Sequence, residues 1–261
     1  MKAIVFAGQG SQFKGMGKEL LTSYPKLTQR ASDVLGYSIQ ELCLEDVDNK
    51  LDQTRYTQPA LYVINALSWE KWRETHRTPV AFFAGHSLGE YNALLAAEAF
   101  DFETGLKLVQ KRGKFMSETG GGGMLAVLGI DVEEIRKILQ KQQISELDVA
   151  NYNTPTQTIL SGPREKISEV ESLFTSRRIR CLPLNVSAAF HSRYMQEAQK
   201  EFAFFLKQFS FSPLKTPVIA NATARPYQDG EVADLLARQI AGSVLWSDSI
   251  YYLMDQGEVT F

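Results

Sequence analysis

Short apolar runs alternate with amphipathic stretches over the first hundred residues. Residues 3–7 and 80–84 are continuous apolar runs, which is the pattern of strands buried on both faces of a parallel sheet. Between them, apolar side chains recur at helical spacing over residues 58–72, and residues 88–100 are rich in the helix formers Ala, Leu and Glu. The order strand, helix, strand, helix predicts an α/β domain.

Four consecutive glycines at residues 120–123 mark a change in this pattern and favour a domain boundary. The segment after them predicts strands over 124–130, 148–152, 158–161 and 181–186, a turn at 153–155, and helices over 131–143 and 165–176. This βαββαβ order in about 65 residues is that of a ferredoxin-like fold, whose ends lie close together. We therefore predict a small domain over residues 123–188, inserted into a larger one.

The α/β pattern resumes after the predicted insert. Helices are expected over residues 192–209 and 230–240, with a strand over residues 217–221. The larger domain is therefore predicted to be discontinuous, with residues 1–122 and 189–261 completing one parallel sheet.

Composition and charge exclude several classes of protein. The 261 residues are 44% hydrophobic and 22% charged, as in globular enzymes, and 28 basic against 30 acidic residues give a net charge of −2. No overall field attracts nucleic acid or an anionic membrane. With no run of 18 apolar residues and no signal peptide, the protein is expected in the cytoplasm. Cys43 and Cys181 lack any CxxC context, so we expect ordinary thiols and no metal site.

A G-x-S-x-G motif at Gly85, Ser87 and Gly89 lies between a predicted strand and a predicted helix. In that context a sharp turn presents the serine hydroxyl at a helix N-terminus, where N–H groups and the helix dipole favour an oxyanion. Ser87 is therefore a candidate nucleophile. The alternative is an ordinary glycine turn capped by a serine.

A serine nucleophile needs a base, and the chain has only three histidines. His86 neighbours Ser87, but adjacent side chains on such a turn diverge, and His76 lies in a polar segment expected to face solvent. His191 remains as the candidate base, where the large domain resumes. The alternative for His191 is a hydrogen-bonded histidine of the core.

Four motifs in order along nearly the whole chain resemble the malonyl-CoA:acyl-carrier-protein transacylase family. They are GQGSQ at residues 8–12, GHSLGE at residues 85–90, KRG with a following methionine at residues 111–116, and AFHS at residues 189–192. The amino-acid sequences of residues 58–61 and 100–105 look most similar to those of the discrete acyltransferases that serve trans-acyltransferase polyketide synthases.

The resemblance implies a hydrolase-like large domain carrying the ferredoxin-like insert. It also implies transfer of a malonyl group from malonyl-CoA to the phosphopantetheine thiol of an acyl carrier protein, in polyketide or fatty acid synthesis. Ser87 would form the malonyl ester, His191 would move the proton, and the N–H groups of Gln9 and Leu88 would form the oxyanion hole. The backbone carbonyl of Gln239 would orient His191. No bound cofactor is implied, since the coenzyme A thioester is the substrate, and the chain is expected to act as a monomer or within a larger synthase assembly.

For substrate choice, the resemblance gives Arg112 the malonyl carboxylate, which a guanidinium can bind through two parallel hydrogen bonds. Taken alone, Arg112 would be a solvated charge on a helix. Phe190 would crowd an α-methyl branch and favour malonyl over methylmalonyl, while Gln58 and Asn153 would line the pocket.

Two other functions are compatible with parts of the sequence. An acyl hydrolase that clears acyl groups from carrier proteins would use the same Ser87 and His191, but would not need Arg112. A non-catalytic module that docks carrier proteins would need none of the three. Members of the family that the chain resembles usually continue past the position of Phe261 into a strand and a Gly-Pro-Gly turn; if that strand completes the sheet, its absence would expose a sheet edge and apolar surface.

Overall fold

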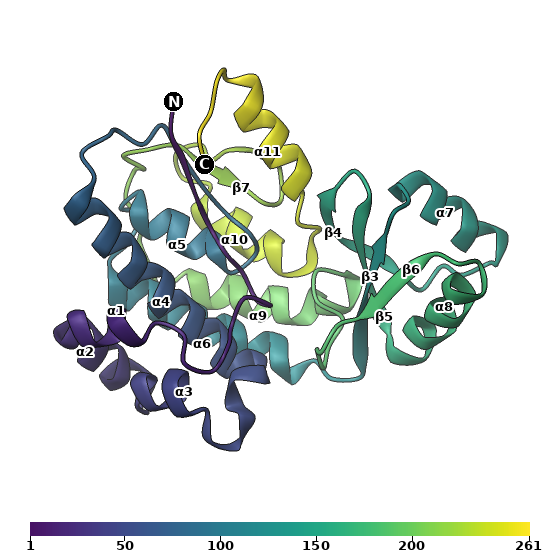
Figure 1. The fold of residues 1–261 in the computed structure, drawn as a ribbon, viewed down its shortest axis with the longest axis horizontal. Coiled ribbons are helices and arrows are strands. Elements are labelled where there is room, and N and C mark those ends of the chain that lie inside the picture. The colour runs from purple at the N-terminus through teal and green to yellow at the C-terminus, as the bar shows by residue number, and fades with distance from the viewer.

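The apolar runs near the N-terminus form neighbouring strands of a sheet in the computed structural model, which describes residues 1–261 (Figure 1). Strands β1 (Ala3–Phe6), β2 (Phe82–Gly85) and β7 (Val218–Ala220) are parallel, in the order β1-β2-β7-β8. Strand β8 (Arg225–Pro226) is antiparallel to β7. The sheet is thus mixed rather than purely parallel, because the chain reverses within four residues after β7, which is too short for a parallel crossover.

One predicted helix ends earlier than the sequence suggests. Helix α5 (Gly89–Ala96) ends before Glu98, which adopts a φ of 63° that a helix cannot contain. The side chain of Asp101 then accepts a hydrogen bond from the Thr104 N–H at 2.8 Å and caps a new helix, α6 (Phe102–Glu118). The composition of residues 88–100 favours helix throughout, so only this backbone reversal separates the two helices.

The other helices of the large unit pack around its sheet. Figure 1 shows α1 to α3 at the end of the molecule away from the second sheet, and the two chain termini side by side near α11. None of the helices is both long and apolar enough to cross a lipid bilayer. Their bounds are α1 Lys18–Ser23, α2 Pro25–Leu35, α3 Ile39–Glu45, the 3₁₀ helix η1 Val47–Asp52, α4 Thr54–Thr75, the 3₁₀ helix η2 Arg193–Met195, α9 Gln196–Leu206, α10 Val232–Ala241 and α11 Trp246–Asp255.

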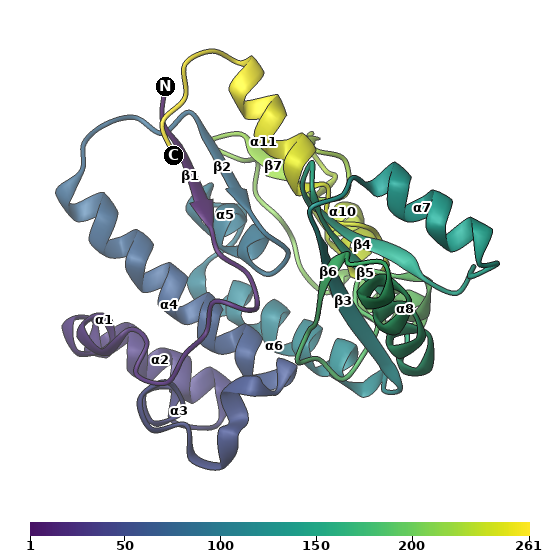
Figure 2. The same ribbon diagram turned by 45° about the vertical axis from the view of Figure 1, so that its right-hand side comes forward.

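The segment after the glycine run forms a second sheet, and its βαββαβ order is present as predicted. Its strands are antiparallel in the order β4-β5-β3-β6. The elements are β3 Gly122–Leu128, α7 Val132–Lys141, β4 Asp148–Thr154, β5 Gln157–Pro163, α8 Arg164–Ser176 and β6 Arg180–Pro183. Figure 2 shows α7 and α8 on the side of this sheet that faces away from the rest of the molecule.

The two faces of β3 contribute to different cores. Leu125 and Val127 pack with residues of α7 and α8 in a separate apolar core. Met124 and Ala126 point the other way and belong to the main core, as expected from the two-residue period of a strand. The second sheet therefore has its own hydrophobic core on one face and presents the other face to the large unit.

The ends of this second unit lie close together, as the sequence predicts. A Cβ built on Gly122, at the start of β3, would lie 2.2 Å from the backbone nitrogen of Ala189. Only glycine can occupy this position without moving the backbone of one of the two segments. The entry and exit of the second unit are therefore in direct contact.

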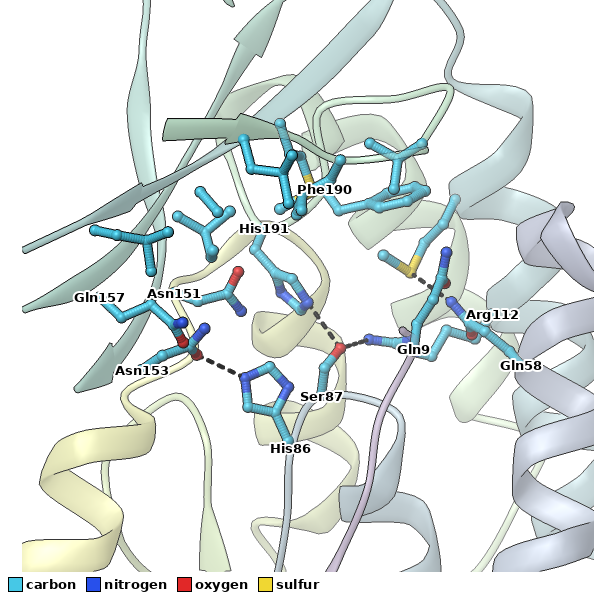
Figure 3. Close-up of a pocket in the computed structure, with 18 residues that line it drawn as sticks. Gln9, Gln58, His86, Ser87, Arg112, Asn151, Asn153, Gln157, Phe190 and His191 are labelled. Carbon is cyan, nitrogen blue, oxygen red and sulfur yellow. Dashed lines mark hydrogen bonds between the residues drawn. The ribbon is translucent and has the colours of Figure 1, made fainter. Parts of the chain in front are cut away.

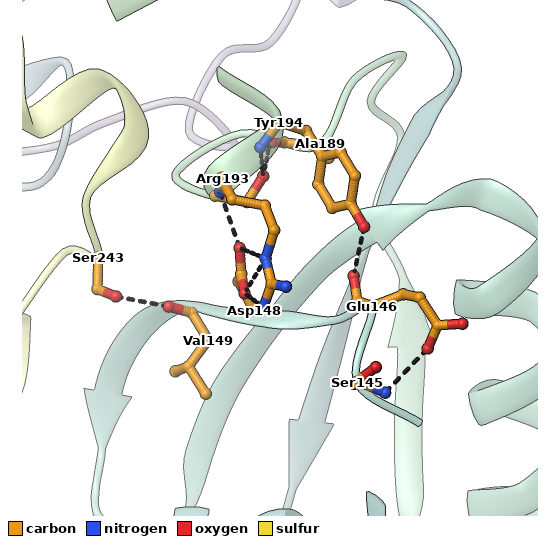
Figure 4. Close-up of polar contacts among 9 residues, drawn as sticks. Ser145, Glu146, Asp148, Val149, Ala189, Arg193, Tyr194 and Ser243 are labelled. Carbon is orange, nitrogen blue, oxygen red and sulfur yellow. Dashed lines mark hydrogen bonds and ion pairs between the residues drawn. The ribbon is translucent and has the colours of Figure 1, made fainter. Parts of the chain in front are cut away.

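Polar contacts fasten strand β4 to the large unit (Figure 4). The Asp148 carboxylate accepts hydrogen bonds from Arg193, including its backbone N–H at 2.8 Å and its Nε at 2.9 Å. Tyr194 donates from its hydroxyl to the carbonyl oxygen of Glu146 at 3.0 Å, and Ser243 from its hydroxyl to that of Val149 at 2.6 Å. These bonds fix the second sheet beside the turn that carries His191.

Candidate active site

Ser87 lies on a sharp turn between β2 and α5, in a left-handed conformation with φ of 51°. A Cβ on Gly85 would lie 2.0 Å from the carbonyl carbon of Gly89, and one on Gly89 would lie 2.2 Å from the Phe6 oxygen. The strained turn therefore requires both glycines of the G-x-S-x-G motif, because backbone atoms occupy the space that side chains would need. Its effect is to raise the Ser87 hydroxyl above the end of the sheet.

We predict that Gly89→Ala destabilises the protein, since the added methyl would meet the carbonyl of β1 and neither backbone segment can easily move. The free energy of unfolding, measured by urea denaturation, should fall by about 1–3 kcal/mol. Gly120→Ala is the matched control, because nothing lies within 4 Å of its Cβ position. A change within about 0.5 kcal/mol is expected for the control. Equal stability of both variants would contradict this explanation of the motif.

His191 lies opposite Ser87, with its Nε2 2.8 Å from the serine Oγ (Figure 3). Its Nδ1 lies 2.8 Å from the carbonyl oxygen of Gln239 and 3.2 Å from that of Gly242. Carbonyl oxygens only accept hydrogen bonds, so Nδ1 carries the proton and Nε2 is left to accept from the Ser87 hydroxyl. The contact between His191 and the Gln239 carbonyl is present as the family resemblance implied.

Burial keeps the imidazole of His191 neutral. Loss of solvent and, to a lesser degree, the nearby Arg112 guanidinium lower its pKa to about 3, against the opposing effect of the Gln239 and Gly242 carbonyls. A histidine that must accept a proton needs its neutral form at neutral pH. The environment of His191 supplies that form.

Arg112 is almost fully buried, with 1% of its surface exposed, rather than solvated as its local sequence alone suggests. Its Nη2 donates to Ser87 Oγ at 3.0 Å and to Gln239 Oε1 at 2.8 Å, while its Nε has no partner. Ser87 Oγ therefore donates to His191 and accepts from Arg112. A guanidinium with a free N–H beside the reactive oxygen is well placed to bind an anionic group of an acyl chain.

A cavity of about 360 Å³ opens above Ser87, between the two units (Figure 3). One wall is apolar and comes from the second sheet and the segment after it. The polar predicted residues Gln9, Gln58, Arg112 and Asn153 line the cavity, together with Phe190 and His191. The apolar wall consists of Met124, Ala126, Leu128, Ile159, Leu182, Leu184 and Val186.

The remaining predicted residues lie at the edges of the reactive centre. The backbone N–H groups of Gln9 and Leu88 donate no hydrogen bond within the protein. Asn153 lies on β4 and its Oδ1 is 2.9 Å from Nε2 of His86. Gln58 has 1% of its surface exposed and its Oε1 has no partner. No group of three or more His, Cys, Asp or Glu side chains is arranged to hold a metal ion.

Three buried residues near the site were not predicted from the sequence. Asn221 accepts the Ser87 N–H at 2.6 Å and donates to the Gly85 carbonyl at 2.8 Å, so it holds both sides of the turn. The Tyr227 hydroxyl donates a hydrogen bond to the Glu90 carboxylate behind Ser87. The available signals were weak: Asn221 is a polar residue at the end of a predicted strand, and Glu90 is a charge in an otherwise apolar helix start.

Comparison with known proteins shows the family to which a chain with this site belongs. The family model for the acyl transferase domain matches residues 3–261 of this chain. The polyketide biosynthesis malonyl CoA-acyl carrier protein transacylase PksC of Bacillus subtilis (strain 168) is 51% identical over 263 residues, which cover 100% of this chain and 91% of PksC. The polyketide biosynthesis protein PksE of the same strain is 50% identical, but the chain spans only 34% of its length.

A solved structure agrees with these relatives. The malonyl CoA-acyl carrier protein transacylase of Burkholderia pseudomallei superposes with a TM-score of 0.97 at 45% sequence identity. The match covers 100% of this chain and 92% of that protein. Likeness in both sequence and structure therefore extends over both units, including the segment that carries the second sheet.

Proposed function

The chain belongs to the acyl transferase domain family, and from that premise we propose that it is a malonyl-CoA:acyl-carrier-protein transacylase. It moves a malonyl group from malonyl-CoA to the phosphopantetheine thiol of an acyl carrier protein, for polyketide or fatty acid synthesis in the cytoplasm. The observation that carries the proposal is the position of Arg112, whose buried guanidinium lies 3.0 Å from Ser87 Oγ at the base of the cavity.

The reaction proceeds through a malonyl ester of Ser87. His191 Nε2 takes the proton from Ser87 Oγ as the oxygen attacks the thioester carbonyl, and passes it to the departing sulfur of coenzyme A. In the second half, His191 takes the proton of the phosphopantetheine thiol as the sulfur attacks the ester, and it returns that proton to Ser87 Oγ as the bond from the carbonyl carbon to Oγ breaks. The free N–H groups of Gln9 and Leu88 stabilise the oxyanion in both halves. The Gln239 carbonyl keeps the proton on Nδ1 and so keeps Nε2 basic.

Substrate choice depends on the walls of the cavity. Arg112 binds the malonyl carboxylate, which an acetyl donor lacks. Phe190, 5% exposed, leaves little room for an α-methyl branch and favours malonyl over methylmalonyl by about 1–3 kcal/mol. Gln58 and Asn153 contact the acyl chain or the pantetheine arm from the polar side of the cavity.

We also propose a division into two domains. Residues 1–122 and 189–261 form a hydrolase-like catalytic domain, and residues 123–188 form a ferredoxin-like small domain. The strand order β4-β5-β3-β6 and the separate apolar core between the second sheet and α7 and α8 support the small domain. The contact between Gly122 and Ala189 supports an insertion at a single point.

The experiment that tests the function is loading with malonyl-CoA labelled in the malonyl group. The wild-type protein should retain about one label per chain after denaturation, and a peptide containing Ser87 should carry it. Ser87→Ala should retain none, because only the Ser87 hydroxyl lies within hydrogen-bond distance of His191 Nε2. Ser192→Ala is the control for loss of a buried serine. Label that persists in Ser87→Ala would refute the proposal.

An acyl hydrolase remains the alternative, since Ser87 and His191 would serve it equally well. It is less well supported, because it has no need for Arg112 and because PksC is named a transacylase. The two differ in the acceptor. Addition of a carrier protein bearing phosphopantetheine should discharge the labelled enzyme much faster than water does, and equal rates would favour the hydrolase.

A further inference from the structure

Glu90 is a fully buried carboxyl on α5 that has no part in the reaction described above. Its oxygens accept hydrogen bonds from the Tyr227 hydroxyl, from Gln239 Nε2 and from the backbone N–H of Asn221, the last at 3.3 Å. All three partners are donors. A carboxylate only accepts hydrogen bonds, so this surrounding suits the ionised form of Glu90.

The side-chain amide of Gln239 connects Glu90 to Arg112. Gln239 Nε2 donates to Glu90 Oε2 and to the Ser87 carbonyl at 2.8 Å, which leaves Gln239 Oε1 to accept from Arg112 Nη2 at 2.8 Å. The opposite amide orientation would place an NH₂ group against the guanidinium, which has only donors. An ionised Glu90, together with the Ser87 carbonyl, thus fixes the amide in the orientation that holds Arg112 beside Ser87.

The charges in this region are otherwise unbalanced. Arg112 is fully buried and forms no direct ion pair, although a buried charge is costly without a partner. The titratable and charged groups around Glu90 are Arg112 from α6, Tyr91 beside it on α5, and Tyr227 from the segment after β8. Glu90 is the one carboxyl among them, so it alone can balance the guanidinium.

The proton affinity of Glu90 agrees with this position. Burial raises the pKa of Glu90 to about 7 even though the hydrogen bonds from Tyr227, Gln239 and Asn221, and the charge of Arg112, act to lower it. The Glu90 carboxyl therefore gains or loses its proton near pH 7. Any further negative charge beside Arg112 should raise its pKa and add a proton.

We propose that Glu90 is the counter-charge of Arg112 in the empty pocket, that it positions Arg112 through Gln239, and that it takes up a proton when a malonyl carboxylate reaches Arg112. Glu90 is thus a positioning residue that exchanges its charge with the substrate. The part that concerns malonyl rests on the proposed function.

Acylation itself exchanges no proton with solvent, which makes the uptake measurable. The bond from Ser87 Oγ to the malonyl carbonyl carbon forms as the carbon–sulfur bond breaks, and the serine proton passes through His191 to the coenzyme A thiol. A thiol with a pKa of about 8.5 stays largely protonated at pH 7.5, and its small ionisation is the same for every variant. Uptake beyond that background must come from a group of the protein.

The first experiment measures proton uptake at pH 7.5 in weak buffer with a pH indicator, during stoichiometric loading with malonyl-CoA. The wild-type protein should take up a substantial fraction of a proton per malonyl ester, and Glu90→Gln should take up none. The matched control is Glu201→Gln, which changes an exposed helical glutamate and should keep the wild-type uptake. Normal acylation of the wild-type protein without proton uptake would overturn the proposal.

A second experiment needs no substrate. The infrared band of a protonated carboxyl is followed against pH in the resting protein, where Glu90→Gln should lack a band that the wild-type protein loses near pH 7. Arg112→Gln should move that midpoint upward, since the balancing cation is gone. An unchanged midpoint would overturn the pairing of Glu90 with Arg112.

The proton uptake on loading and the infrared midpoint together test this inference separately from the proposed function. If malonyl-CoA fails to acylate Ser87, the proposed function is wrong, and the infrared midpoint still decides the pairing. If Glu90→Gln does not fold, the proton stoichiometry of the wild-type protein and the midpoint of Arg112→Gln decide instead. A merely structural role for Glu90 would produce neither the uptake nor the shift.

Discussion

His191→Ala is expected to lower the rate constant for acylation of Ser87 by malonyl-CoA by about 10²- to 10⁴-fold, as measured by rapid quench. The imidazole Nε2 is the acceptor for the serine proton at 2.8 Å, and no other histidine takes that place. Because the pKa of His191 is lowered to about 3, its neutral form persists throughout the neutral range. Protonation of His191 should therefore reduce the rate only as the pH falls toward 3, and not at the usual histidine pKa of about 6.5.

His76→Ala is the matched control for this prediction. His76 is exposed just after the C-terminal end of α4 and stacks on Trp72, with ring centroids 4.7 Å apart, and it does not line the cavity above Ser87. Its removal should leave the acylation rate within about twofold of wild type, because surface substitutions away from special features have small effects. Rapid acylation of His191→Ala would show that a different group accepts the proton.

The part of the site that the sequence predicts is the part with local causes. Gly85, Ser87 and Gly89 specify the turn within five residues, since the close backbone approaches lie in the motif and in the neighbouring strand. His191 follows from a count of three histidines and the exposure expected for two of them. The pocket positions of Arg112 and Gln239 could be anticipated only through the family resemblance, because nothing nearby in sequence distinguishes Arg112 from a surface charge.

The buried network behind Ser87 could not be predicted, because its members meet only in the folded chain. Glu90 accepts hydrogen bonds from three residues on three different segments, which lie between 131 and 149 positions further along the chain. Single-sequence patterns carry no information on such pairs. The fold shows the same limit: the early end of α5 depends on the backbone at Glu98, and the short strand β8 has too few residues to leave a pattern.

Arg112→Gln is expected to reduce the preference for malonyl-CoA over acetyl-CoA by about 100-fold or more, measured as the ratio of the kcat/KM values for loading Ser87. The carboxylate of a malonyl ester lies one methylene beyond the carbonyl carbon, within reach of the guanidinium beside Ser87 Oγ. Arg112 Nε has no partner and can donate alongside an Nη group. Two charge-assisted hydrogen bonds contribute about 1.5–3 kcal/mol each, so their loss exceeds the roughly 2.8 kcal/mol that a 100-fold change requires.

Lys114→Gln is the matched control, because Lys114 lies on the same helix with half of its side chain exposed and pairs only with Glu118 at the surface. It loses the same charge without touching the cavity, so both donors should load as in the wild-type protein. Thermal unfolding of Arg112→Gln shows whether the variant is folded, since the substitution also leaves Glu90 without its counter-charge. A folded Arg112→Gln that keeps the malonyl preference would refute carboxylate binding by Arg112. A loss that is equal for both donors would instead indicate that Arg112 acts on Ser87 itself, through the hydrogen bond to Oγ, and not on the choice of acyl group.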